Sequence, residues 1–177
     1  EPLCAGSATA EVFTISGADS LVFTNAGATG RFGPTQAQIN TAYSGTDLDG
    51  EVTINTQGIQ EWIVPADGIY RIKAAGASGG EVGPSSSSYG LPGRGAIVAA
   101  EYSLNKGEVI KIVVGQNGES SVLNRGGGGG GGSYIVKGSI PLLVAAGGGG
   151  QNTGSDRHLD GVALDDRGDQ GGAIGHG

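Results

Sequence analysis

The feature that most constrains this chain is a run of seven consecutive glycines, residues 126–132, directly before the apolar residues 133–136. Glycine loses more conformational freedom on folding than any other residue, and ordering a backbone costs about 1–2 kcal/mol per residue. The run is therefore either an unstructured linker or a segment that needs roughly 10 kcal/mol of stabilisation from elsewhere in the fold.

Composition and charge exclude several classes of protein. Glycine accounts for 38 of 177 residues, but no G-X-Y repeat is present and there are only six prolines, which excludes collagen. Valine, isoleucine and leucine are clustered, which favours a folded core over disorder. No apolar run approaches the ~18 residues of a membrane-spanning helix. A net charge of −7 with dispersed basic residues argues against nucleic acid as a partner.

The hydrophobic pattern indicates an all-β fold. Apolar residues alternate, and Gly or Asn turns recur at the spacing of an antiparallel sandwich or barrel. The expected strands are 11–15, 21–24, 51–56, 60–64, 69–74, 96–102, 109–114, 133–136 and 141–145. One short helix is expected within 35–43, capped by Thr35.

Turn residues predict how some of these strands are joined. Pro65 and Gly68 suit a turn in a hairpin that would place Tyr70, Ile72 and Ala74 on one face. Two further turns are expected at 105–107 and at Asn117-Gly118. Trp62 is expected to be buried, because aromatic residues are only 5% of the chain and the core needs them; an exposed anchor for a partner is the alternative.

Glycine clusters at 76–80, 126–132, 147–150 and 168–177 lie next to strand ends, so they join strands of one domain. An extended helix of the polyproline type has three residues per turn and no internal hydrogen bonds, and without side chains neighbouring helices can bond directly. We therefore predict a bundle of polyglycine-II helices, in which Gly129→Val is expected to be highly damaging. The main candidate residues are Gly126, Gly127, Gly128, Gly129, Gly130, Gly131 and Gly132, with Gly147, Gly148, Gly149 and Gly150.

Five sequence stretches occur in an order that resembles a known family. They are "FTNAGATGRFGPTQAQINTAYSGT" (23–46), "IQEWIVPADGIYRIKAAGASGG" (59–80), "IVVGQNGE" (112–119), the glycine run, and "PLLVAAGGGG" (141–150). Together they resemble the extracellular glycine-rich region of the anaplastic lymphoma kinase and leukocyte tyrosine kinase receptors, and of related microbial surface proteins. The resemblance implies a jelly-roll sandwich like that of tumour necrosis factor, with inserted glycine helices, no catalysis, and binding of small protein ligands. Ala26 and Ile39 replace receptor cysteines, and no Asn-x-Ser/Thr acceptor is present.

No motif indicates catalysis or a cofactor. Residues 76–80 match G-x-S-x-G around Ser78, with His158 downstream, but the glycines and Pro84 that follow cannot form the helix that a nucleophile elbow requires. Residues 115–121 lack the lysine of a phosphate-binding loop. The acidic stretch 155–169 matches no calcium-loop spacing and is expected to be a solvated loop, with calcium binding left open. It ends in Arg-Gly-Asp (167–169), a tripeptide used in cell adhesion.

We consider residues 1–22 an N-terminal arm or strand and residues 23–177 one domain. The main hypothesis is a non-catalytic extracellular or cell-surface module that self-associates into a filament or adhesin by strand donation. The donated strand would comprise Glu11, Val12, Phe13, Thr14 and Ile15, and Cys4 would be free or form an intermolecular disulfide. The alternative is a receptor-type domain whose acidity suits a small basic protein ligand.

Overall fold

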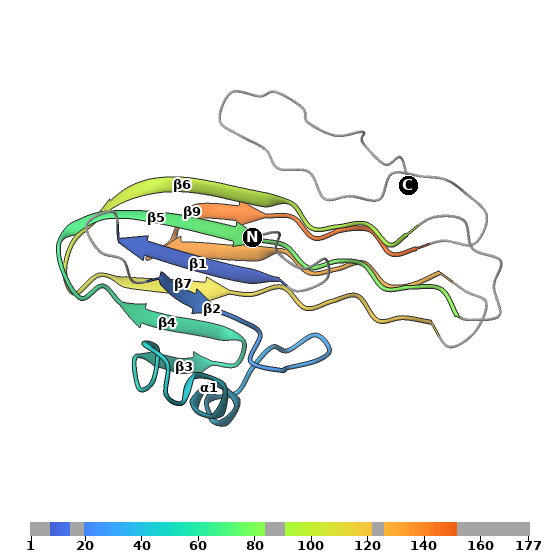
Figure 1. Cartoon of the computed structure of the whole chain (residues 1–177), viewed down its shortest axis with the longest axis horizontal. Coiled ribbons are helices and arrows are strands. Elements are labelled where there is room, and N and C mark those ends of the chain that lie inside the picture. The colour runs from blue at the N-terminus through green and yellow to red at the C-terminus, as the bar shows by residue number, and fades with distance from the viewer. Residues whose placement is uncertain (1–7, 15–19, 84–90, 122–125, 152–177) are drawn as a thin grey trace.

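The computed structural model of the chain describes residues 8–14, 20–83, 91–121 and 126–151. In these ranges the strands are β1 (Thr9–Thr14), β2 (Ser20–Phe23), β3 (Val52–Thr56), β4 (Ile59–Ile63), β5 (Gly68–Ala75), β6 (Ile97–Leu104), β7 (Val109–Val113), β8 (Ser133–Lys137) and β9 (Ile140–Ala145), and the helix is α1 (Gln36–Tyr43). They form a four-stranded sheet, β2-β1-β5-β6, and a five-stranded sheet, β3-β4-β7-β8-β9. The prediction of an all-β sandwich is confirmed (Figure 1).

The elements lie where the hydrophobic pattern predicts them, each within a few residues of the expected bounds. Helix α1 begins at a capping box: the N–H of Gln38 donates to the Thr35 hydroxyl, and the N–H of Thr35 donates to Oε1 of Gln38 at 3.0 Å. The helix buries Ile39 and Tyr43 beside β2 and β3. Local residue chemistry therefore fixes both the strands and the helix.

The hairpin predicted at 65–68 is wrong, because its turn crosses from one sheet to the other. β4 pairs with β3 and β7, whereas β5 pairs with β1 and β6. The turn at 105–107 likewise joins β6 of one sheet to β7 of the other. Because of this crossing, Trp62 and Tyr70 meet across the core, with ring centroids 5.9 Å apart. The predicted burial of Trp62 is confirmed, since it is 2% exposed.

The core contains one buried polar network beneath the loop that follows β2. The Tyr43 hydroxyl donates to Oε1 of Gln60 at 2.7 Å and accepts the N–H of Thr24 at 2.9 Å. Nε2 of Gln60 donates to the Thr24 carbonyl at 2.7 Å. Each group in this apolar core has a partner, so the network fixes the start of the loop to α1 and to β4.

Strand β1 lies inside the four-stranded sheet. Its backbone pairs with β2 on one side and with β5 on the other. The predicted donor strand, residues 11–15, of which Ile15 lies outside the described residues, is therefore not unpaired in the single chain. Donation to a neighbouring chain would require exchange of a strand that is already bonded on both edges.

Candidate functional site

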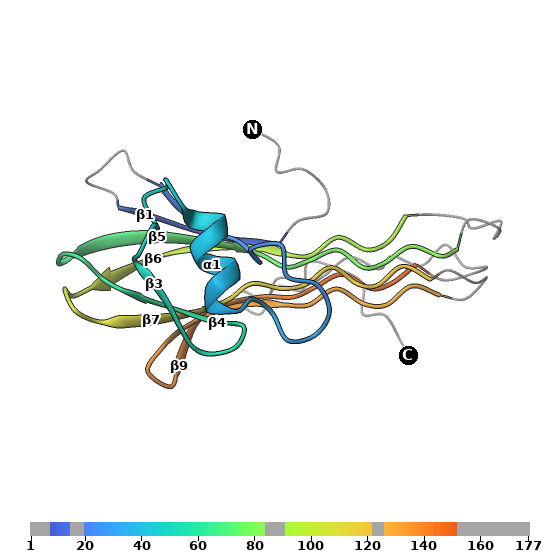
Figure 2. The same cartoon turned by 90° about the horizontal axis from the view of Figure 1, so that it is seen from below.

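Five extended segments leave one end of the sandwich side by side (Figures 1 and 2). We call them g1 (76–83), g2 (91–96), g3 (115–121), g4 (126–132) and g5 (146–151), and together the glycine array. Segments g1, g3 and g5 follow β5, β7 and β9 away from the sandwich, whereas g2 and g4 lead back into β6 and β8. Each segment therefore continues a strand, as the sequence predicts for the glycine clusters at 76–80, 126–132 and 147–150.

The segments are joined by backbone hydrogen bonds that recur every three residues. From g1, the N–H groups of Gly76 and Gly79 donate to the carbonyls of Ala96 and Gly93 in g2, and those of Ala77 and Gly80 donate to Gly131 and Gly128 in g4. From g3, Gly118 and Ser121 donate to Ser78 and Glu81 in g1. From g5, Gly148 and Gln151 donate to Ala77 and Gly80 in g1. The same spacing joins g2 to g5, g3 to g4, and g4 to g5. All of these bonds lie between 2.8 and 2.9 Å, so they compensate for part of the entropy that the glycines lose.

Most of these positions require glycine because a side chain would not fit there, and not because of the backbone angle. None of the array glycines adopts a left-handed φ. A Cβ at Gly130 would lie 2.3 Å from the Ala77 carbonyl oxygen, and one at Gly147 would lie 2.0 Å from the Gly130 carbonyl oxygen. Gly129 differs, because its nearest neighbour would be 3.7 Å away. The expectation that Gly129 is a critical position is therefore wrong, and Gly130 takes its place.

The predicted turn at Asn117-Gly118 is also wrong. These residues continue along g3, where the Gly118 N–H bonds to Ser78 of g1 and a Cβ at Gly118 would lie 2.1 Å from the Gly128 carbonyl oxygen. Gly115 and Gly118, three residues apart, face the array, so g3 needs glycine only at the positions that contact its neighbours.

Two buried polar side chains fasten the ends of the array. At the sandwich end, the Ser133 hydroxyl donates to the Ala75 carbonyl at 2.7 Å and accepts the Gly115 N–H at 3.0 Å. At the far end, Oε1 of Gln151 accepts the Val82 N–H at 2.9 Å. The Ser133 bonds connect g3 to β5 and β8, and the Gln151 bond joins g5 to g1.

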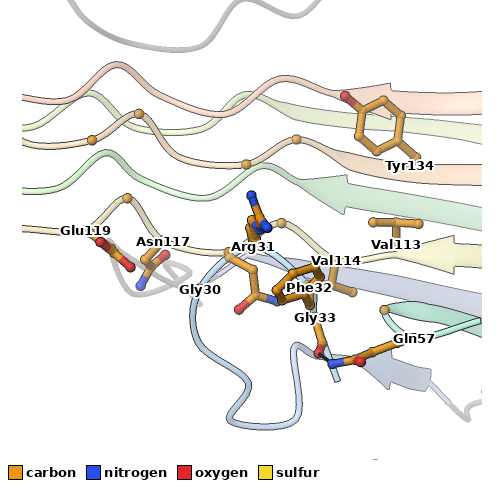
Figure 3. A pocket seen from close by; sticks show the side chains of 18 of the residues that line it. Gly30, Arg31, Phe32, Gly33, Gln57, Val113, Val114, Asn117, Glu119 and Tyr134 are labelled. Atoms are coloured by element: carbon orange, nitrogen blue, oxygen red, sulfur yellow. Dashed lines mark hydrogen bonds between the residues drawn. The ribbon is translucent and has the colours of Figure 1, made fainter. Parts of the chain in front are cut away.

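A groove of about 660 Å³ lies where the array meets the five-stranded sheet (Figure 3). Its walls come from the loop 30–33, the β3–β4 turn, segments g3 and g4, and Tyr134 of β8. Phe32 is 63% exposed and Tyr134 is 43% exposed, and the Arg31 guanidinium lies 4.6 Å from the centre of the Phe32 ring. Exposed aromatic and arginine side chains beside a hollow are the residue types that anchor protein partners.

Glycines hold the aromatic wall of the groove in place. Gly33 and Gly58 both adopt left-handed φ, and a Cβ at Gly58 would lie 2.4 Å from the Phe32 carbonyl oxygen. Nε2 of Gln57 donates to the Gly33 carbonyl at 3.2 Å, and the Gly58 N–H donates to the Pro34 carbonyl at 3.0 Å. The loop is thus packed backbone to backbone against the β3–β4 turn.

The groove also contains a donor with no partner. Nε2 of Gln116 is buried and makes no hydrogen bond within the described residues, while Oε1 of the same side chain accepts from Nδ2 of Asn25 at 3.4 Å. A buried donor without an acceptor costs about 1–3 kcal/mol.

The ionisable groups whose pKa is shifted do not line the groove. Burial raises the pKa of the Tyr43 hydroxyl, and it also raises the pKa of Tyr102. The Asn105 N–H and the nearby Lys137 ammonium lower the pKa of Glu108. Within the described ranges no cluster of three or more His, Cys, Asp or Glu side chains could hold a metal ion, and no helix is long and apolar enough to cross a membrane.

The structure brings together the glycines of 126–132 and 147–150 that the sequence singles out. Cys4, His158, the acidic stretch 155–169 and the glycine cluster 168–177 lie outside the described residues. The sequence does not predict Phe32, Gln116 and Tyr134 as a site, because these residues are distant from one another in the chain.

Comparison with known proteins finds a related receptor. No family model matches the chain. Over 104 residues, 56% of this chain, it is 38% identical to the leukocyte tyrosine kinase receptor of Mus musculus. The chain spans 11% of that receptor's length. The match supports a relationship to the receptor family that the sequence resembles, limited to this region.

Proposed function

We propose that this chain is an extracellular, receptor-type domain that binds a protein ligand through the groove beside the glycine array. The observation that carries the proposal is that the exposed side chains of Phe32 and Tyr134 line one hollow. The partial match to a receptor supports the same class of function. Ligand binding of this kind needs no catalytic residue and no cofactor.

The glycine array would serve as the rigid support of this site. The three-residue recurrence of its hydrogen bonds supports polyglycine-II helices, which have three residues per turn, inserted into a jelly-roll sandwich. Because g3 and g4 form part of the groove and are bonded to their neighbours along their length, a ligand would order little backbone when it binds. Preorganisation of this kind raises affinity by lowering the entropic cost of association.

The charge of the chain favours a basic ligand. The formal net charge is −7, and complementary charge accelerates encounter more than it strengthens the final complex. Association with a basic ligand should therefore slow as salt concentration rises, whereas dissociation should change little.

The test uses the small protein ligands of leukocyte tyrosine kinase receptors as probes, with binding measured by surface plasmon resonance. The double variant Phe32→Ala/Tyr134→Ala removes both exposed anchors of the groove. Loss of an interface hot spot costs about 2 kcal/mol or more, so we expect binding at least ~30-fold weaker. The control is Ile69→Ala, an equally apolar side chain that is 55% exposed on the other sheet, and it should bind normally. Equal affinity of the double variant and the control would refute the groove as the site.

A further inference from the structure

The outer face of the five-stranded sheet is apolar. Strands β4, β7, β8 and β9 alternate between residues that face the core and residues that face outward, and the register brings the outward residues into rows across the sheet. The outward apolar residues are Ile59, Ile63, Val109, Val113, Tyr134, Val136, Pro141 and Val144. Four of them, Ile63, Val109, Tyr134 and Val144, are 41–58% exposed. A contiguous exposed patch of this kind marks a surface that contacts another molecule.

One pair of opposite charges lies within this apolar face. Glu61 of β4 lies opposite Lys111 of β7, and the pair of Ile63 and Val109 flanks it on one side. On its other side the two strands continue to residues 59 and 113, which are also apolar. The face is therefore locally neutral in a chain whose net charge is −7, so it does not share the acidity that favours a basic ligand.

We propose that this face binds the same face of a second copy of the chain, in a dimer with two-fold symmetry. The surface of such a dimer must be complementary to itself: where a residue i of one copy contacts a residue j of the other, j of the first also contacts i of the second. A glutamate beside a lysine meets this requirement, because a two-fold rotation can place each charge against its opposite in the other copy. The apolar residues around the pair meet it as well, since they can pack against one another.

The charged pair also selects the direction of the symmetry axis. When two sheets pack face to face, the two-fold axis lies in the plane between them. An axis parallel to the strands, between β4 and β7, places Glu61 of each copy against Lys111 of the other, and Ile63 against Val109. An axis across the strands at this row would instead place equal charges against each other. The strands of the two copies are therefore nearly aligned, as in the common packing of two sheets.

The size of the face sets the expected affinity. Five strands about 4.8 Å apart, each with about five residues of about 3.4 Å, span a flat area of about 400 Å². A standard interface buries about 800 Å² on each partner. We therefore expect a weak dimer, with a dissociation constant in the micromolar range or above. The face adjoins the groove at Val113 and Tyr134, but dimerisation is measured without a ligand, so its failure and the failure of ligand binding are separate results.

The test is sedimentation velocity of the full chain over a concentration series. The wild type should pass from monomer to dimer as its concentration rises. Glu61→Lys and Lys111→Glu each place two equal charges against each other across the axis, so each variant should dimerise at least ~10-fold more weakly. An equimolar mixture of the two variants should dimerise like the wild type, because every lysine then faces a glutamate of the other copy. This recovery cannot arise within one chain, since each variant keeps two equal charges side by side.

The outer face of β5 and β6 provides a matched control. Arg71 lies opposite Glu101 there and both side chains are exposed, but the next outward isoleucine, Ile69, lies opposite Ser103, so no row of large apolar side chains flanks the charges on that side. Arg71→Glu and Glu101→Lys change the net charge by the same amounts as the test variants. Both control variants should dimerise like the wild type.

Four results would overturn the proposal. A wild type that stays monomeric at millimolar concentration would show that a second copy does not cover the face. A mixture that is no more dimeric than its two components would exclude the two-fold pairing of Glu61 with Lys111. Equal losses in the control variants would assign the effect to net charge. Growth beyond the dimer would mean that the contact does not close. The double variant Glu61→Lys/Lys111→Glu keeps opposite charges within the chain and across the axis, so it should dimerise like the wild type.

Discussion

At the scale of single residues, adjacent glycines in one run have different requirements. A methyl group at position 130 would lie 2.3 Å and 2.5 Å from two carbonyl oxygens of g1, whereas one at position 129 would have 3.7 Å of clearance. We expect Gly130→Ala to lower the free energy of unfolding by about 1–3 kcal/mol, as overpacking of a close contact does. Gly129→Ala, its matched control, should change it by less than about 0.5 kcal/mol. Urea denaturation of both variants measures the difference, and equal stability would mean that g4 is not packed against g1.

Tyr43 is the second residue whose role can be isolated. Replacing it with Phe leaves the buried Oε1 of Gln60 and the Thr24 N–H without partners, at a cost of about 1–3 kcal/mol. Burial raises the pKa of Tyr43 in the folded state, so its contribution is complete below the unfolded pKa near 10 and is lost as pH rises through the folded pKa. Thermal midpoints across the alkaline range should therefore fall more steeply for the wild type than for Tyr43→Phe. Parallel curves would show that another group causes the alkaline loss.

At the scale of elements, the array depends on its attachment to the strands. Ser133 begins β8 and bonds both to Ala75 at the end of β5 and to Gly115 at the start of g3. Ser133→Ala leaves these two buried backbone groups unpaired and should cost about 1–3 kcal/mol. Ser103→Ala, an exposed change on β6, should cost less than about 0.5 kcal/mol and serves as the control. Calorimetry measures the thermal unfolding midpoints of the two variants. Similar midpoints would show that water replaces the hydrogen bonds of Ser133 without a loss of stability.

The sequence predicts the elements better than their connections. The alternation of apolar and polar residues predicts the nine strands of the described residues, because inward and outward positions are a property of each strand alone. The turn residues at 65–68 and 105–107 permit a change of direction but do not determine whether the next strand joins the same sheet. Asn117-Gly118 fits a tight turn equally well, and only contacts with g1 and g4 hold it extended. The groove could not be predicted, because Phe32 and Tyr134 become neighbours only after both sheets have formed.

At the scale of the whole molecule, the β-sandwich and the glycine array form one body in which the five strands β5 to β9 continue into segments of the array (Figure 2). The aromatic core lies inside the sandwich, while the backbone groups of the array form hydrogen bonds between its own neighbouring segments. The groove lies at the junction, so a ligand bound there would contact both parts. The proposed binding function thus depends on the array being ordered.

Residue-resolved amide hydrogen exchange of the intact protein tests that order most directly. The N–H groups of Gly127, Gly128, Gly130 and Gly131 donate to other segments, whereas that of Gly129 donates to no described segment. We predict slow exchange at these four glycines and fast exchange at Gly129 between them. Uniformly fast exchange across 126–132 would contradict the account, because it would mean that the seven glycines form an unstructured linker.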